Sequence, residues 1–129
     1  MALTDSAVAV MLPITDAARA REFYGERLGL AYDGTDEEGS LSFRAGGGAT
    51  LVLRQLPAGS QSANTAMSFK VDDITSEISD LEGRGVTFED YDQPGFTTVD
   101  HVFDGGGLKA AWFLDPDGNI LCLHQEKTG

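Results

Sequence analysis

The sequence predicts an α+β protein made of two tandem βαβββ modules, and two regularities support this fold class. First, an apolar strand followed by an aspartate-capped helix occurs twice, with Asp16 and Asp73 57 residues apart. Second, each helix is followed by a hairpin, and the two hairpins align at an offset of 70 residues. The aligned residues are Phe43, Gly48 and Leu53 in the first hairpin and Phe113, Gly118 and Leu123 in the second.

The length of 129 residues suits a single domain with one real core, and neither module is large enough to bury its own sheet face. Module 1 is expected over about residues 5–56 and module 2 over about residues 64–126. Residues 57–63 between them are small and polar, which is typical of a linker.

In module 1, residues 7–14 are apolar and β-branched, as in a buried strand. Asp16 then caps a helix, and Gly29 ends it, because glycine enters the left-handed conformation without a Cβ clash. Three strands follow, at residues 30–32, 41–44 and 49–56.

In module 2, a strand at residues 67–71 precedes a helix that Asp73 caps and Gly85 ends. Residues 86–88 are expected to form the next strand, and the segment from Asp90 to Gly107 an elaborated loop rich in Asp and Gly. The last hairpin has strands at residues 110–114 and 120–123, joined by a turn at residues 115–119.

The formal charge of −12 disfavours nucleic acid and anionic membranes as partners, since no cluster of Lys or Arg offsets it. Cys122 is the only cysteine, so no internal disulfide can form and nothing points to an oxidising compartment. No signal peptide and no apolar run long enough to cross a membrane is evident. We therefore expect a cytoplasmic protein.

Two stretches resemble the vicinal oxygen chelate superfamily, which includes glyoxalase I, extradiol dioxygenases, fosfomycin resistance enzymes and bleomycin resistance proteins. One is the terminal AAWFLDPDGNILCLHQ of residues 110–125, and the other is Asp16 followed by residues 21–24 and 28–30. This resemblance implies that the two modules form a curved mixed sheet around a cavity. It also implies a homodimer.

Metal-dependent members of the family take two ligands from each module, usually His, Glu, His and Glu. The resemblance places these four positions on Ala9, Val52, Ala66 and Cys122. Two alanines and a valine cannot coordinate an ion, and one thiolate does not make a site, so we expect neither a metal nor another cofactor. Cys122 could serve as a nucleophile beside His124, although two residues along a strand separate side chains by about 7 Å; packing is the alternative role.

The resemblance implies that Trp112 faces the cavity, where its indole could stack on a ligand. His101 and Phe96 lie in the elaborated loop, in the region where the family closes over its ligand. The alternative is a rim or core position for Trp112, an exposed loop position for His101, and ordinary core packing for Phe43. The residues predicted to bind a ligand are Trp112, His101, Phe43, Cys122, Phe96 and Val52.

The function predicted from the resemblance is metal-independent binding of a small aromatic or amphipathic molecule, as in bleomycin resistance proteins, with possible sequestration of a drug or natural product. The first alternative is a glyoxalase-like lyase or isomerase, or a dioxygenase, of the same superfamily. A further alternative is a structural dimer with a filled cavity. The identity of the ligand, any residual catalysis, the role of Cys122 and the pairing of modules within one chain or across two stay open.

Overall fold

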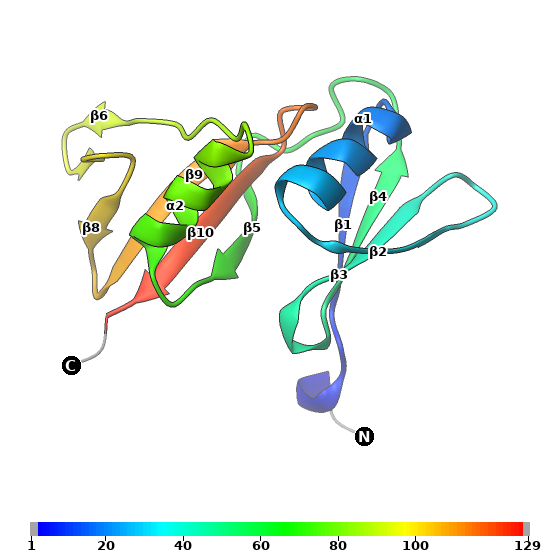
Figure 1. Cartoon of the computed structure of the whole chain (residues 1–129), viewed down its shortest axis with the longest axis horizontal. Coiled ribbons are helices and arrows are strands. Elements are labelled where there is room, and N and C mark those ends of the chain that lie inside the picture. The colour runs from blue at the N-terminus through cyan, green and yellow to red at the C-terminus, as the bar shows by residue number, and fades with distance from the viewer. Residues whose placement is uncertain (1–2, 128–129) are drawn as a thin grey trace. The chain divides into compact units, whose positions relative to one another are not determined.

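The computed structural model describes residues 3–127, and its contacts divide the chain into unit 1, Met1–Gln61, and unit 2, Ser62–Gly129. Each unit contains one four-stranded sheet and helical segments, which confirms the predicted α+β fold class (Figure 1). In the described part of the chain, no helix combines the length and the apolar character that crossing a membrane requires.

In unit 1, β1 lies parallel to β4, and the other neighbouring strands are antiparallel in the order β1-β4-β3-β2. Alternate residues along each strand point to opposite faces. Phe43, Leu51 and Leu53 are buried on one face, whereas Met11 is 53% exposed on the other. The elements of unit 1 are η1 (Leu3–Asp5), β1 (Ala9–Ile14), α1 (Ala17–Arg21), η2 (Glu22–Arg27), β2 (Ala31–Thr35), β3 (Leu41–Arg44), η3 (Gly46–Gly48) and β4 (Thr50–Gln55).

The helix expected between Asp16 and Gly29 forms, but in two parts. Asp16 caps α1 as predicted, since its Oδ1 accepts a hydrogen bond from the backbone N–H of Arg19 at 3.0 Å. From Glu22 onward the chain is a π-helix, in which the Leu28 N–H donates to the Phe23 carbonyl five residues back. Gly29 then adopts a φ of 76°, as the predicted helix end requires.

Unit 2 repeats the sheet order as β5-β10-β9-β8, and its parallel pair is β5 and β10. Asp73 caps α2 by accepting a hydrogen bond from the Ser76 N–H at 3.2 Å. Gln125 also caps this helix from the sheet, because its Oε1 accepts the Ile74 N–H at 2.8 Å. The elements of unit 2 are β5 (Thr65–Lys70), α2 (Ile74–Gly83), β6 (Asp92–Gln93), β7 (Phe96–Thr97), β8 (Phe103–Gly105), β9 (Leu108–Leu114) and β10 (Ile120–Glu126).

Two expectations for module 2 are wrong. Residues 86–88 do not form a strand, because only Phe88 pairs with the sheet, through a single bridge to Phe113. The segment from Asp90 to Gly107 is also not simply a loop, since it contains the hairpin β6–β7 and the strand β8. β8 occupies the free edge of β9 from Leu108 to Ala110, so only the far end of that edge is left for Phe88.

The sheet of unit 2 has two faces with different surroundings. Figure 1 shows α2 lying along β9 and β10, where Phe113 and Leu121 are fully buried. We call this side the helix face. By strand alternation, Trp112, Cys122 and His124 point to the opposite side, which we call the aromatic face.

Candidate functional site

Four aromatic side chains gather on the aromatic face of unit 2. Trp112 on β9 is half-buried and lies 5.2 Å from Phe96 and 5.6 Å from Tyr91 between ring centroids. Phe96 in turn stacks on Phe103 at 4.9 Å and contacts Tyr91 at 5.2 Å. These spacings fall within the range of favourable aromatic pairs. The cluster is therefore a connected aromatic wall.

The polar edge of Trp112 is also fixed. Its indole Nε1–H donates to Thr65 Oγ1 on β5 at 3.2 Å, which limits rotation of the ring. Tyr91 supplies the one ionisable group among the four aromatics, and burial, followed by the charges of Glu89 and Cys122, raises its pKa above the ordinary value. The wall therefore stays uncharged at neutral pH, as stacking on an apolar ligand requires.

Next to the wall lies a small polar group made of Ser68, Cys122 and His124. Ser68 Oγ and His124 Nδ1 are 2.6 Å apart, which is hydrogen-bond distance. The Cys122 thiol donates to the Leu123 carbonyl at 3.2 Å and is 5% exposed. Burial raises the pKa of this thiol, and a hydrogen bond with Ser68 offsets only part of that effect. Cys122 is thus a neutral thiol. The hydrogen-bond partner of His124 Nδ1 is Ser68.

The four positions of the family's metal ligands do not suit a metal ion. Ala9 and Val52 lie in unit 1, and Ala66 and Cys122 in unit 2. Two methyl groups, an isopropyl group and one protonated thiol do not provide the imidazole and carboxylate donors that a divalent ion needs. Within residues 3–127, no group of three or more His, Cys, Asp or Glu side chains could hold a metal ion.

His101 lies away from the aromatic wall. Its Nδ1 is 3.0 Å from Asp90 Oδ1 and its Nε2 is 3.3 Å from Glu82 Oε2 on α2. Its ring also lies 6.1 Å from that of Phe88, which packs against the buried Phe113. These contacts put His101 on the helix face, where it ties the segment before β8 to α2.

The other predicted ligand residues are divided between the units. Phe43 is fully buried in unit 1, where its ring lies 5.6 Å from Tyr32 and 6.1 Å from Tyr24, so it belongs to the core there. Val52 lies on β4 of the same unit. Of the predicted set, the structure brings together Trp112, Phe96 and Cys122. A ligand role for any of the six stays a prediction.

Sequence reasoning missed several residues of this site. Tyr91 and Phe103 complete the aromatic wall, and Ser68 and Thr65 supply its hydroxyl groups. One signal was present in the sequence, because three aromatic residues, Tyr91, Phe96 and Phe103, occur in a segment otherwise rich in Asp and Gly. Ser68 and Thr65 gave no such signal.

The comparisons with known proteins agree on one superfamily. A family model described as Glyoxalase/Bleomycin resistance protein/Dioxygenase superfamily matches residues 6–123. Among curated proteins, none matches the sequence.

Solved structures that resemble the chain cover nearly its whole length. An antibiotic binding protein from Streptomyces sp. CB03234 is 24% identical, with a TM-score of 0.74 over 95% of this chain and 97% of that one. A glyoxalase/bleomycin resistance protein from the same strain is 26% identical, with a TM-score of 0.68 over 94% and 100% of the two chains. A member of the superfamily from Sphaerobacter thermophilus is 24% identical, with a TM-score of 0.72 over 94% and 97%.

Proposed function

The chain belongs to the glyoxalase/bleomycin resistance protein/dioxygenase superfamily, and from this premise we propose that it binds a small, flat aromatic or amphipathic molecule without a metal ion. One of the similar structures is described as an antibiotic binding protein, which favours a binding role over a catalytic one. The ligand class that we propose is accordingly an aromatic antibiotic or a related natural product.

The aromatic wall is the observation that carries this proposal. Trp112 offers a large stacking surface, and its contacts with Phe96, Tyr91 and Thr65 hold the ring in place before a ligand arrives. An ordered aromatic side chain loses little conformational freedom on binding, so more of the stacking energy contributes to affinity.

The polar group beside the wall can orient such a ligand. Ser68 and His124 present a hydroxyl and an imidazole on the same face as Trp112, and either can exchange hydrogen bonds with a phenol, quinone or amide. Cys122, which pairs with Ser68 across the strands, adds a neutral, polarizable and nearly buried thiol beside them. Protection by such a protein requires stoichiometric binding and no bond-making step.

The proposal includes a cytoplasmic homodimer, since members of this superfamily can bind ligands in a crevice shared between subunits. A single buried cysteine in a chain without disulfides fits a reducing compartment. Size-exclusion chromatography with light scattering tests the dimer, and a mass equal to one chain would remove this part of the proposal.

Fluorescence titration tests the site directly, because Trp112 is the only tryptophan in the chain. Polycyclic aromatic antibiotics are screened for quenching of its emission, and calorimetry then measures the affinity of each hit for the unchanged protein and for Trp112→Ala. We expect the substitution to weaken binding about fivefold or more, since the loss of the stacking contact should cost more than about 1 kcal/mol.

Met11→Ala is the matched control, because Met11 is an exposed apolar residue of a sheet in unit 1. It should leave the affinity unchanged. Equal affinity of the Trp112→Ala variant and the unchanged protein would remove Trp112 from the site. Stoichiometric zinc, iron, nickel or manganese in the purified protein would instead favour the superfamily's lyase, isomerase or dioxygenase chemistry.

A further inference from the structure

A pocket lies on the helix face of unit 2. It has a volume of about 460 Å³ and is bounded by α2, by β9 and by the segment that leads into β8. Ile78 forms part of it from α2, where this side chain is 5% exposed. Val102 lines it from the opposite side, and Val99 is 70% exposed. A volume of this size suits a small molecule, and these side chains give the pocket an apolar part.

This pocket is separate from the aromatic wall, although the same two strands contribute to both. On β7, Phe96 joins the wall and Thr97 lines the pocket. On β8, Phe103 joins the wall and Asp104 lines the pocket. Since neighbouring residues of a strand point to opposite faces, a ligand in the pocket does not touch Trp112.

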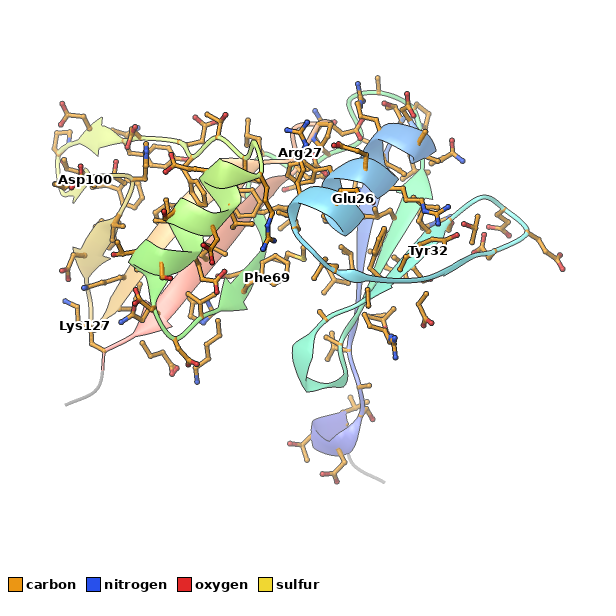
Figure 2. All side chains as sticks on the ribbon, viewed as in Figure 1. Glu26, Arg27, Tyr32, Phe69, Asp100 and Lys127 are labelled. Atoms are coloured by element: carbon orange, nitrogen blue, oxygen red, sulfur yellow. The ribbon has the colours of Figure 1, made fainter. Side chains whose placement is uncertain are left out.

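Two opposite charges in the pocket have no ion-pair partner in the described part of the chain. Asp104 is paired with Lys127, and Lys109 lies across the strand pair from Asp104, where its charge helps to lower the pKa of that carboxyl, but Lys109 forms no ion pair among residues 3–127. Asp100 likewise forms no ion pair within those residues. Figure 2 shows Asp100 in the turn ahead of β8 and Lys127 at the end of β10.

The backbone holds Asp100 in an unusual conformation. Asp100 and His101 have φ values of 51° and 72°, and Val99 and Val102 exchange backbone hydrogen bonds of 2.8 and 3.0 Å around them. This is the two-residue hairpin turn with positive φ at both central positions, which usually takes Asn and Gly. His101 secures the turn through Glu82 and Asp90. Strained residues that the surrounding structure holds in place are typical of ligand-binding positions.

We propose that this pocket binds a zwitterion the size of an aliphatic dipeptide. The ligand's ammonium group pairs with Asp100, its carboxylate pairs with Lys109, and its alkyl side chains contact Ile78 and Val102. Thr75 and Thr97 add hydroxyl groups at the pocket wall. The inference is independent of the proposed function, because none of these residues belongs to the aromatic wall.

The experiment uses the full chain, labelled with ¹⁵N, and three probes of matched size. These are leucyl-leucine, its N-acetyl derivative without the ammonium charge, and leucyl-leucinamide without the carboxylate. Leucyl-leucine should shift the amide resonances of residues around Ile78, Asp100 and Lys109, with a Kd of about 1 mM or below. Each blocked probe should bind at least about tenfold more weakly.

Two variants assign the charges. Asp100→Asn keeps a side chain that tolerates positive φ and removes only the carboxylate, so it should weaken leucyl-leucine about tenfold or more. In Lys109→Gln, leucyl-leucine and leucyl-leucinamide should bind equally, because the group that distinguishes them has lost its partner. An unchanged Trp112 fluorescence spectrum shows that each variant remains folded.

Three results would overturn the proposal: no shifts with leucyl-leucine at about ten times the expected Kd, shifts confined to the Trp112 side of the sheet, or equal binding of all three probes. None of them bears on aromatic binding by Trp112, which is measured with different compounds.

Discussion

The two units share one plan but differ in where their fourth strand comes from. In unit 1, β2 starts at Ala31, four residues after η2 ends at Arg27. In unit 2, α2 ends at Gly83 and the equivalent strand, β8, starts only at Phe103. The sheet orders β1-β4-β3-β2 and β5-β10-β9-β8 are nonetheless the same. The segment between α2 and β8 is therefore an addition to a repeated framework.

Both candidate sites of unit 2 contain residues from this added segment. Phe96 and Phe103 extend from it to the aromatic wall, while Asp100 and Asp104 extend from it to the pocket on the helix face. Unit 1 lacks such a segment, and Met11 on its sheet is exposed. The added segment therefore supplies part of both candidate sites, while Trp112 and Lys109 come from the repeated strand β9.

The largest expected effect tests whether the repeated cores are equivalent. Phe43 and Phe113 correspond in the repeat, and both are fully buried. Phe43→Ala and Phe113→Ala should each lower the free energy of unfolding by about 3–5 kcal/mol, because each removes a ring that the surroundings cannot replace. Urea unfolding, followed by circular dichroism, gives both values.

The two losses should agree within about 1 kcal/mol, since the chemistry is the same and only the relaxation around each cavity differs. A loss below about 1 kcal/mol for one of the two variants would show that the units do not have equivalent cores. Hydrogen exchange measured on each variant would then show which unit loses its protection.

A smaller effect is expected in the turn before the last strand of each unit. Asp115 Oδ1 accepts backbone hydrogen bonds from Asp117 and Asn119 at 2.9 and 2.8 Å, and its Oδ2 accepts one from the Asn119 amide at 2.7 Å. Asp115→Ala should destabilise the protein by about 2–3 kcal/mol, because it removes the charged acceptor of these three buried or partly buried hydrogen bonds. Thermal unfolding is the measurement.

The equivalent turn in unit 1 provides the control. Ala45 occupies the position of Asp115, and both residues donate a backbone hydrogen bond to the carbonyl four residues on, at 2.9 and 3.0 Å. Ala45→Asp should change stability by no more than about 0.5 kcal/mol. An equally large change for the two substitutions would contradict a specific role for the Asp115 carboxylate.

Local signals in the sequence sufficed for the repeated framework. Asp16 and Asp73 cap their helices by the predicted hydrogen bonds, and Gly29 and Gly85 have positive φ where the helices were expected to end. These caps depend on neighbouring residues, so one sequence is enough to find them, whereas the cap that Gln125 adds to α2 from the sheet was not predictable in this way. The π-helical turn after Glu22 was not predicted, because a shift from one helical hydrogen-bond pattern to another leaves the apolar spacing almost unchanged.

Pairing between distant segments was not predictable in the same way. Residues 86–88 were expected to form a strand, but β8 pairs with the edge of β9 and only Phe88 makes a bridge to it. Trp112 and Phe96 were selected separately, and the structure shows them in contact. His101 was selected for the same site but lies on the other face, since one turn decides the side to which a loop residue points. The contact of Ser68 with His124 joins two strands that are distant in the chain.

In the turn that contains His101, two substitutions should differ in stability by about 1 kcal/mol. In the described part of the chain, Asp100 and His101 are the two residues other than glycine with positive φ, whereas unit 1 uses glycine at such positions. His101→Ala should destabilise by about 1–2 kcal/mol, because it loses the partly exposed contacts of the imidazole with Glu82 and Asp90 and keeps the strained backbone. His101→Gly loses the same contacts but relieves the strain, so it should be about 1 kcal/mol more stable than the alanine variant. If urea unfolding shows the His101→Ala variant to be as stable as His101→Gly or more stable, this account of the turn is contradicted.

The smallest expected effect is a difference between the units in the pH dependence of stability. Cys122 in unit 2 corresponds to Val52 in unit 1, which cannot titrate. Burial raises the pKa of the folded Cys122 thiol, so the folded state holds this proton more tightly than the unfolded state does. The stability that results is fully present below the unfolded pKa, near pH 9, and is lost as the pH rises through the higher folded value.

Urea midpoints measured at rising pH should therefore fall more steeply for the unchanged protein than for Cys122→Ala. Cys122 also helps to raise the pKa of Tyr91, so the difference between the two curves reports the thiol together with its effect on Tyr91. Parallel curves would mean that Cys122 is no more buried in solution than an exposed thiol.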